Sequence, residues 1–484
     1  MPFFSSRWRY VLLAAALHII LAITIFLIGH FQLFPGTFDQ NGVGLTFAID
    51  STTYQRVASD LAEVWQRDGF TAWLNAKAPL HSRLYSLTFI TFGRLLGHNV
   101  LAAEPLNLFY YLAILICIYV IGCEVFDAQT GFIAATIVAL WPTFLGHSTQ
   151  LMRDPLSIAC LLWLMVVLVL VLGREFRALT GIAIGIAGAL LATLFWVARG
   201  NMWNVVLVAI AIALGMLVFR MVREKRFITG NALVMLFVIA AALLVPPRLE
   251  STSLPGVRPP LTPLAIPTAS QPAAREGVWA TALKQISTRR AGFRFYHSRA
   301  SDIDPEVQFS NTGAILRFIP RALVIGFFAP FPYMWIEEGS FGYATRIISG
   351  LETLAMYFVY LAVALCVWRE RRNQKMWLLF LVASIGMLAL GLVVVNAGAL
   401  FRLRYACWIL MIVLGSRGLH RFTARSVSQI RQNPECRPHS YRTTPSASPP
   451  KSPRPKRRKS ISLVALGCIP LESSQTRHST PPAA

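Results

Sequence analysis

Residues 153–173 read RDPLSIACLLWLMVVLVLVLG, and this stretch decides the fold class. No charged residue follows Asp154 until Arg174, so the segment is long and apolar enough to cross the hydrocarbon core of a bilayer as one helix. Asp154 and Pro155 suit the first turn of that helix, because an acid is favoured at a helix N-terminus and proline is tolerated there. The stretch therefore predicts a transmembrane helix over 156–173 that begins at a charged boundary.

Similar apolar runs recur along the chain, which is 55% hydrophobic and only 14% charged. This composition excludes an ordinary soluble domain. Arg7 and Arg9 precede the first run, as in a signal peptide, but no small-residue cleavage site follows it, so we interpret it as a retained helix. We predict an all-α polytopic membrane protein with ten spans, near residues 10–29, 105–122, 131–147, 156–173, 179–197, 202–219, 230–247, 349–368, 376–395 and 404–419.

The net charge of +23 is concentrated toward the C-terminus. Twelve Lys and Arg against two Glu follow residue 420, in a Ser/Pro-rich tail that contains KSPRPKRRK at 451–459. Such a segment cannot bury a core, so residues 421–484 are predicted to be a disordered cytoplasmic tail near anionic lipid headgroups. This placement argues against nucleic-acid binding. The seven cysteines form no CxxC pair, and no nucleotide-binding or zinc-protease motif is present.

The basic loops between the spans set the predicted topology. Cytoplasmic loops carry the excess of Lys and Arg, and the ten spans place every basic cluster inside, together with both termini. Two apolar stretches, 84–97 and 318–335, must then not cross, because Arg94 interrupts the first and Arg321 and two prolines interrupt the second. We expect both to lie as helices along the outer membrane face. In the alternative topology both cross, which flips only the middle of the chain. The basic clusters are Arg174 and Arg177; Arg220, Arg223, Lys225 and Arg226; and Arg369, Arg371, Arg372 and Lys375.

This topology predicts four parts and one polar side. The parts are a membrane module over 1–247 with a first outer loop at 30–104, an outer loop region with juxtamembrane helices over 248–348, the last spans over 349–420, and the tail over 421–484. The polar residues that share the outer side are Asp50, Tyr54, Arg153, Asp154, Arg199, Arg402 and Arg404.

Each of these residues has a structural and a functional interpretation. Asp50 either caps the amphipathic outer helix that begins there or acts as a general base. Asp154 either starts its transmembrane helix or orients a substrate or a cation. Outer arginines run against the positive-inside bias, and they suit either bidentate binding of a substrate phosphate or contact with lipid phosphates. These arginines are Arg199, Arg402 and Arg404.

The order of features over residues 5–200 resembles the GT-C membrane glycosyltransferases. The branch that it resembles most contains the dolichyl-phosphate-mannose protein mannosyltransferases and the bacterial aminoarabinose and lipopolysaccharide-core transferases. The residues that carry the resemblance are, in order, Asp50 with Tyr54, Ala78-Pro79-Leu80 before Leu84-Tyr85, Leu95-Leu96-Gly97, Phe126, Gly131-Phe132-Ile133-Ala134-Ala135, Ala139-Leu140-Trp141-Pro142 and Arg153-Asp154.

The resemblance implies transfer of a sugar, with inversion, from a polyprenyl-phosphate carrier to a hydroxyl of a glycan, lipid or protein acceptor. It also implies a bacterial inner membrane with the active site on the extracytoplasmic face. Asp50 then matches the catalytic acidic residue and Asp154 the second one, whereas Arg402 and Arg404 match late arginines at the carrier phosphate more loosely. Tyr54, Arg153 and Arg199 are expected to contact the substrate.

Two departures from the family leave the acceptor class and the metal open. Ala76-Lys77-Ala78-Pro79 stands where many relatives have Glu or His before Pro-Pro, and Glu104-Pro105 stands where an arginine often starts the next span. A divalent cation, which some relatives use, is the one candidate cofactor.

Two other functions fit part of the sequence. A polysaccharide polymerase or O-antigen-ligase-like enzyme would also use lipid-linked sugars and outer arginines. A flippase or transporter is disfavoured, because the singled-out charges lie at span ends rather than at the bilayer midplane, and no internal repeat is visible.

Overall fold

The computed structural model describes residues 2–33, 49–251, 278–295, 301–336 and 343–432. Within these ranges the chain is helical, and the one extended pairing is an isolated bridge between Asp302 and Asn396. A compact unit, Met1–Ser428, holds the helices discussed below, whereas of the second unit, Gln429–Ala484, only the last turn of α16 is described. The predicted all-α class is confirmed.

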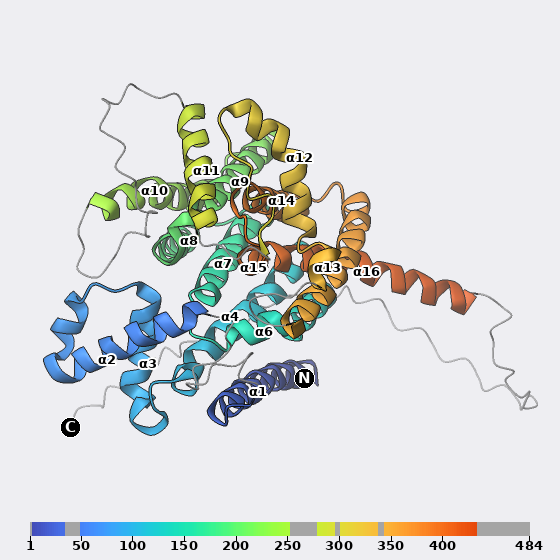
Figure 1. Cartoon of the computed structure of the whole chain (residues 1–484). Helices are drawn as coiled ribbons and strands as arrows, with labels where there is room; N and C mark the ends of the chain where they lie inside the picture. Colours follow the sequence, from blue (N-terminus) through green and yellow to red (C-terminus); the bar gives the residue numbers. More distant parts are fainter. Residues whose placement is uncertain (1, 34–48, 252–277, 296–300, 337–342, 433–484) are drawn as a thin grey trace, which may run out of the picture. The chain divides into compact units, whose positions relative to one another are not determined.

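Figure 1 shows the helices in chain order. They are α1 (Pro2–His30), α2 (Ile49–Asn75), α3 (Leu80–Leu96), α4 (Val100–Val125), α5 (Ala128–Ala139), α6 (Pro142–Ser148), α7 (Asp154–Gly173), α8 (Ala178–Arg199), the short η2 (Gly200–Met202), α9 (Trp203–Glu224), α10 (Thr229–Ser251), α11 (Val278–Phe295), α12 (Thr312–Phe328), the short η4 (Pro332–Trp335), α13 (Tyr343–Arg369), α14 (Gln374–Val393), α15 (Ala397–Leu403) and α16 (Tyr405–Gln432).

Among the described residues, eight helical segments are long and apolar enough to cross a membrane. The number rises to ten when α5 with α6 and α15 with α16, bent by 70° and 57°, are each counted as one span. One of the eight, Ala178–Glu224, contains both α8 and α9. Every predicted span coincides with one of these helices, so the prediction of a multi-pass membrane protein is confirmed.

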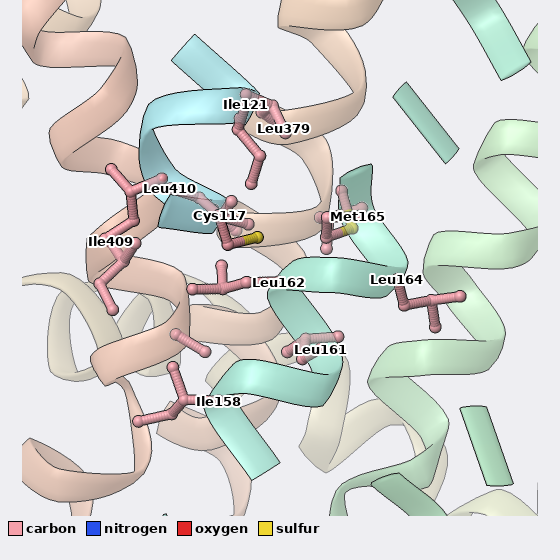
Figure 2. Packing of buried hydrophobic residues seen from close by; sticks show 14 of the residues in the cluster. Cys117, Ile121, Ile158, Leu161, Leu162, Leu164, Met165, Leu379, Ile409 and Leu410 are labelled. Atoms are coloured by element: carbon pink, nitrogen blue, oxygen red, sulfur yellow. The ribbon is translucent and has the colours of Figure 1, made fainter. Parts of the chain in front are cut away.

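The centre of the core is α7, the helix whose sequence is apolar on all sides. It packs against α4, α8, α9 and α14, and 83% of its apolar window is buried. Figure 2 shows Leu162 of α7 beside Cys117 of α4, whereas Leu164 points to the other side of the helix. Ile121 of α4, Leu379 of α14, and Ile409 and Leu410 of α16 belong to the same buried cluster. An apolar helix can face either lipid or other helices, and these contacts and this burial place α7, with Asp154 at its start, in the middle of the bundle.

The loops that carry the basic clusters meet at one end of the helices. Arg174, just after α7, pairs with Glu124 near the end of α4, and Lys375 at the start of α14 donates to the backbone carbonyl of Glu124. Arg417 of α16 pairs with Glu370, just after α13, at 3.0 Å. This common end is what the predicted topology requires of the basic loops.

The segment Thr312–Trp335 is apolar enough for a span, yet its contacts place both of its ends at the same end of the bundle. Its first part packs with Leu392 at the end of α14. The last turn of α12 then reaches Tyr360, midway along α13, and Trp335 returns to Gly350 near the start of α13. A short loop joins the end of α13 to the start of α14, so the two helices form an antiparallel pair. The start of α13 and the end of α14 therefore lie at the same end of the bundle. The segment is therefore re-entrant within the bundle, because it turns back toward the end at which it began. Its position along the outer membrane face stays a prediction.

The C-terminal end of α12 leaves backbone carbonyls without helical partners, and three side chains bind them. The carbonyls of residues 326, 327 and 328 accept hydrogen bonds from Arg404 at 3.3 Å, Tyr360 at 3.1 Å and Tyr357 at 2.7 Å, in that order. An unpaired carbonyl is costly where no water reaches it. These three side chains therefore allow the helix to end inside the bundle.

Two further predictions concern the segments outside the spans. Residues 84–97 fall mostly in α3, which packs against α2 and α4 and is not among the described segments suited to crossing. The disordered tail was predicted to begin at 421. The helix of the last span, α16, instead continues beyond the apolar residues to Gln432. The rest of the predicted tail, 433–484, and the proline-rich loop residues 252–277 lie outside the described residues.

A glycine sets the close approach of α12 and α14. A Cβ at Gly391 would overlap the backbone oxygen of Ala322, so Gly391→Ala should lower the free energy of unfolding by about 1–3 kcal/mol, the usual cost of overpacking. Gly215→Ala on α9 is the matched control, because nothing lies within 4 Å of its added Cβ. We expect that control to be neutral or slightly stabilised. Thermal melts in detergent test the pair, and equal melting temperatures would contradict the close packing.

Candidate functional site

Three helix ends meet at one arginine. Arg402 of α15 donates through Nη2 to Oδ2 of Asp50, in the first turn of α2, at 2.6 Å. Its Nε lies 3.3 Å from Oδ2 of Asp154, the first residue of α7. The two acids that the sequence singled out are therefore joined by a side chain from the C-terminal part of the chain.

Asp154 also has a second guanidinium partner. Its Oδ1 pairs with Nη1 of Arg199 at the end of α8, and the same Nη1 lies 3.3 Å from Oγ of Ser157. The side chains of Asp154 and Arg199 are each only 3% exposed. A carboxylate held between two guanidiniums in the interior fixes the positions of both, because losing one partner leaves an uncompensated buried charge. Asp154 is thus placed to position the arginines.

Asp50 differs from Asp154 in its exposure. Its side chain is 42% exposed, and one of its oxygens is held by Arg402. The second oxygen of Asp50 has no ion-pair partner among the described residues. Of the two acids, Asp50 is therefore the one that a substrate hydroxyl can reach from solution.

Tyr54 and Arg153 lie beside the two acids. Burial raises the pKa of the Tyr54 hydroxyl, and the charges of Arg153, Asp50 and Asp154 act on it as smaller effects of mixed sign. The Nε of Arg153 is buried without a hydrogen-bond partner. Arg153, Arg199 and Arg402 together face two carboxylates, so the cluster has one positive charge in excess. Such a site suits an anionic ligand.

The loop before Asp154 is held by polar side chains from α3 and α4. The hydroxyl of Tyr85 donates to Oδ1 of Asn107 at 2.8 Å and lies 3.1 Å from the carbonyl of Met152. The amide of Asn107 donates to the carbonyl of Thr149 at 3.1 Å. These contacts fix the backbone on both sides of the short loop and so fix where α7 begins.

The same face of α4 holds a second buried polar group, which the sequence reasoning missed. Nδ1 of His18 lies 2.7 Å from Oε1 of Glu104, and its Nε2 lies 3.0 Å from Oγ of Ser148. All three side chains are buried, so this group fastens α1 to α4 and α6 rather than meeting a substrate. An ionisable residue within an apolar span was the signal that could have found it.

Arg404 does not join the acids. It is fully buried, with its guanidinium carbon 4.0 Å above the Trp408 ring and 5.1 Å from the centre of the Phe401 ring. Its Nη1 donates to the carbonyl of Gly326 at the end of α12. The structure thus places Arg404 as a cap on the re-entrant helix, away from Asp50 and Asp154.

His81, near the start of α3, is a site residue that the sequence analysis did not single out. The His81 and Tyr54 rings pack edge to face, with their centres 4.3 Å apart. His81 is only 5% exposed. Burial, with the positive charges of Arg153 and Arg199, lowers the pKa of His81 to about 3. The imidazole is therefore neutral at physiological pH.

This shift predicts a pH dependence of stability. The unfolded chain binds a proton at His81 below about pH 6.5, whereas the folded chain binds it only near pH 3. Stability should therefore fall as the pH is lowered from 6.5 toward 3, and His81→Gln should remove this part of the loss. Melting temperatures of wild type and variant across that range test it. Parallel curves would show that His81 contributes no such proton linkage.

The donors of this site do not fit a resident divalent cation. No group of three His, Cys, Asp or Glu residues that could hold a metal ion occurs in the described part of the chain. Both oxygens of Asp154 and one oxygen of Asp50 instead pair with guanidiniums, whose positive charge repels a cation.

Comparison with known proteins gives no family for the chain: no protein-family model matches it, and neither does any curated protein at a significant level.

Proposed function

We propose that this chain is a polytopic membrane glycosyltransferase of GT-C type, which moves a sugar from a polyprenyl-phosphate carrier to an acceptor hydroxyl. The observation that carries the proposal is the bridge from Arg402 to Asp50 and Asp154. It combines an exposed carboxylate with an excess of positive charge. Transfer from a phosphate carrier needs both a group that accepts a proton and a group that binds the departing phosphate.

The exposed Asp50 is the proposed general base. The acceptor oxygen attacks the sugar C1 from the face opposite the phosphate, the bond from C1 to the phosphate oxygen breaks with inversion, and Asp50 takes the acceptor proton. The electron pair of the broken bond leaves with the carrier phosphate. Because one Asp50 oxygen is hydrogen-bonded to Arg402, the carboxylate is oriented before the acceptor arrives.

The arginines are the proposed phosphate site. Charge develops on the carrier phosphate as the sugar leaves, and guanidiniums already fixed in a partly dry site stabilise that charge without reorganising. Arg402 and Arg199 are fixed by Asp154, and Arg153 directly precedes it. The charges of Arg153, Arg402, Asp50 and Asp154 all act on the Tyr54 hydroxyl, so Tyr54 is the proposed contact of the sugar.

The proposed location is the extracytoplasmic face of a bacterial inner membrane, with both termini in the cytoplasm. Its support is the separation of charges along α7. Asp154 begins this helix at the site, and Arg174 follows its other end, where the basic loops meet. Basic loops stay in the cytoplasm, so the other end of α7 faces outward.

Mass spectrometry of cell-envelope glycans tests the function. Cells that carry the chain are compared with cells from which it has been deleted. Loss of one sugar from an otherwise intact glycan, lipid or protein supports the transferase. Loss of long polymer with the short units retained would instead identify a polysaccharide polymerase or ligase, and unchanged glycans would contradict both.

A further inference from the structure

His81 presents a polar atom that no described residue satisfies. Its Nε2 is buried and has no hydrogen-bond partner, although the ring itself is held edge-on against Tyr54. Leaving a buried nitrogen unpaired costs about 1–3 kcal/mol, so an atom of this kind at a binding site indicates a group that arrives with the ligand.

The charges around His81 limit what that ligand group can be. The guanidiniums of Arg153 and Arg199 and the carboxylates of Asp154 and Asp50 all act on the imidazole. With two positive and two negative charges there, the surroundings favour a neutral partner for Nε2. A phosphate binds more strongly to the guanidiniums than to a neutral imidazole, because each guanidinium can donate two hydrogen bonds in a fixed plane. A nitrogen of a neutral imidazole donates or accepts a hydrogen bond, according to the tautomer. A hydroxyl can do both, so it can pair with either tautomer.

The depth of His81 indicates which substrate supplies the hydroxyl. His81 is 5% exposed, whereas the side chain of the candidate base Asp50 is 42% exposed, so His81 lies deeper in the protein. The acceptor arrives at the exposed side. The sugar of the donor, attached to a phosphate among the arginines, reaches the buried side.

We propose that His81 and Tyr54 form a subsite for a hydroxyl of the sugar being transferred, and that His81 thereby contributes to donor-sugar specificity. This inference rests on the proposed glycosyl transfer. The sugar hydroxyl bonds to Nε2 of His81, and the Tyr54 ring, held by the imidazole edge, lines the sugar face. His81 is a specificity residue in this scheme and takes no proton from the reaction.

Two variants separate hydrogen bonding from packing. His81→Leu fills a similar volume without a polar atom, and His81→Gln retains an amide that can donate and accept. Each purified variant, in lipid nanodiscs, is given two probes: sugar-free undecaprenyl phosphate for binding, and the lipid-linked sugars extracted from cells that normally carry the chain for transfer. The first probe reports on the phosphate site alone.

We expect both variants to bind the sugar-free carrier within about twofold of wild type. For the sugar-charged carrier, His81→Leu should raise KM about tenfold, the equivalent of one lost hydrogen bond, and His81→Gln should recover most of that loss. If His81→Leu does not fold, His81→Ala takes its place, and it should show the same rise in KM with unchanged carrier binding.

Two results would overturn the subsite. One is a wild-type KM in both variants, and the other is an equal loss of affinity for the sugar-free and the sugar-charged carrier, which would show that His81 only supports the fold or the phosphate site. A failure of the proposed function gives a different result, since the wild-type protein itself would then bind no undecaprenyl phosphate and transfer no sugar.

Discussion

We expect Asp50→Asn to lower the rate of the proposed sugar transfer about 10²–10⁴-fold, while insertion into the membrane and thermal stability stay close to wild type. The reason is that asparagine has the same shape and can still accept the hydrogen bond from Arg402, which Asp50 accepts at 2.6 Å. It cannot take a proton, and a general base contributes an effect of this size. The measurement is incorporation of labelled sugar into the acceptor by membranes that contain equal amounts of each protein.

Asp60→Asn is the matched control for this variant. Asp60 lies on the same helix, α2, is exposed, and has no ion-pair partner among the described residues, so the same chemical change should leave transfer unaltered. Transfer by the Asp50→Asn protein at the rate of the Asp60→Asn protein would remove Asp50 from the mechanism.

Arg402→Gln has the second large expected effect. The change removes the guanidinium that joins Asp50 to Asp154, and it leaves the cluster with as many carboxylates as arginines. We expect weaker binding of undecaprenyl phosphate and a fall in transfer of about 10²–10³-fold, as when one preorganised group is taken from a developing charge. Arg402→Lys should recover only part, because an ammonium cannot hold both carboxylates in the same planar geometry.

Arg404→Gln is the informative comparison, since it removes the same charge two residues away. Its guanidinium caps the end of α12, so the variant should melt at a lower temperature, yet its folded fraction should bind the carrier like wild type. Folded protein is isolated by size exclusion before each binding measurement. Equal loss of carrier affinity in the two variants would contradict the separate roles assigned to these arginines.

The spans and the two acids could be predicted because each depends on local sequence. Apolar length identifies a span, and Asp154 lies at the border of one. The basic loops then decide which span ends share a side, and the structure brings Asp50 to the same arginine as Asp154. No spacing in the sequence predicted that Arg402 would bridge them.

The contrast between Arg402 and Arg404 depended on helical register. Residues two apart on a helix point about 200° from each other, so neighbours in sequence face different parts of the bundle. Both arginines lie at the break between α15 and α16, a bend of 57° that the apolar pattern does not reveal. The sequence could therefore predict that Arg402 and Arg404 lie on the same side of the membrane. It could not predict that Arg404 binds the end of α12.

The re-entrant path of α12 was also beyond the sequence, for a different reason. Its prolines indicated that the segment was not a regular span, but its depth depends on tertiary partners. Tyr357 and Tyr360 of α13 and Arg404 bind the carbonyls at its C-terminal end. A helix can end inside a membrane protein only where such donors are available, and these come from distant parts of the chain.

Cysteine labelling in intact cells tests the central claim, that the acid–arginine site lies on the membrane face opposite the basic loops. In a chain whose seven native cysteines have been replaced, single cysteines are placed at Thr53 and Gly398, which are exposed close in sequence to the site acids and arginines, and at Lys225 and Arg372, which are exposed in basic loops. A membrane-impermeant maleimide should label the first two without permeabilisation and the second two only after it. Labelling of Thr53→Cys and Gly398→Cys from opposite faces, or of both only after permeabilisation, would contradict the proposed site.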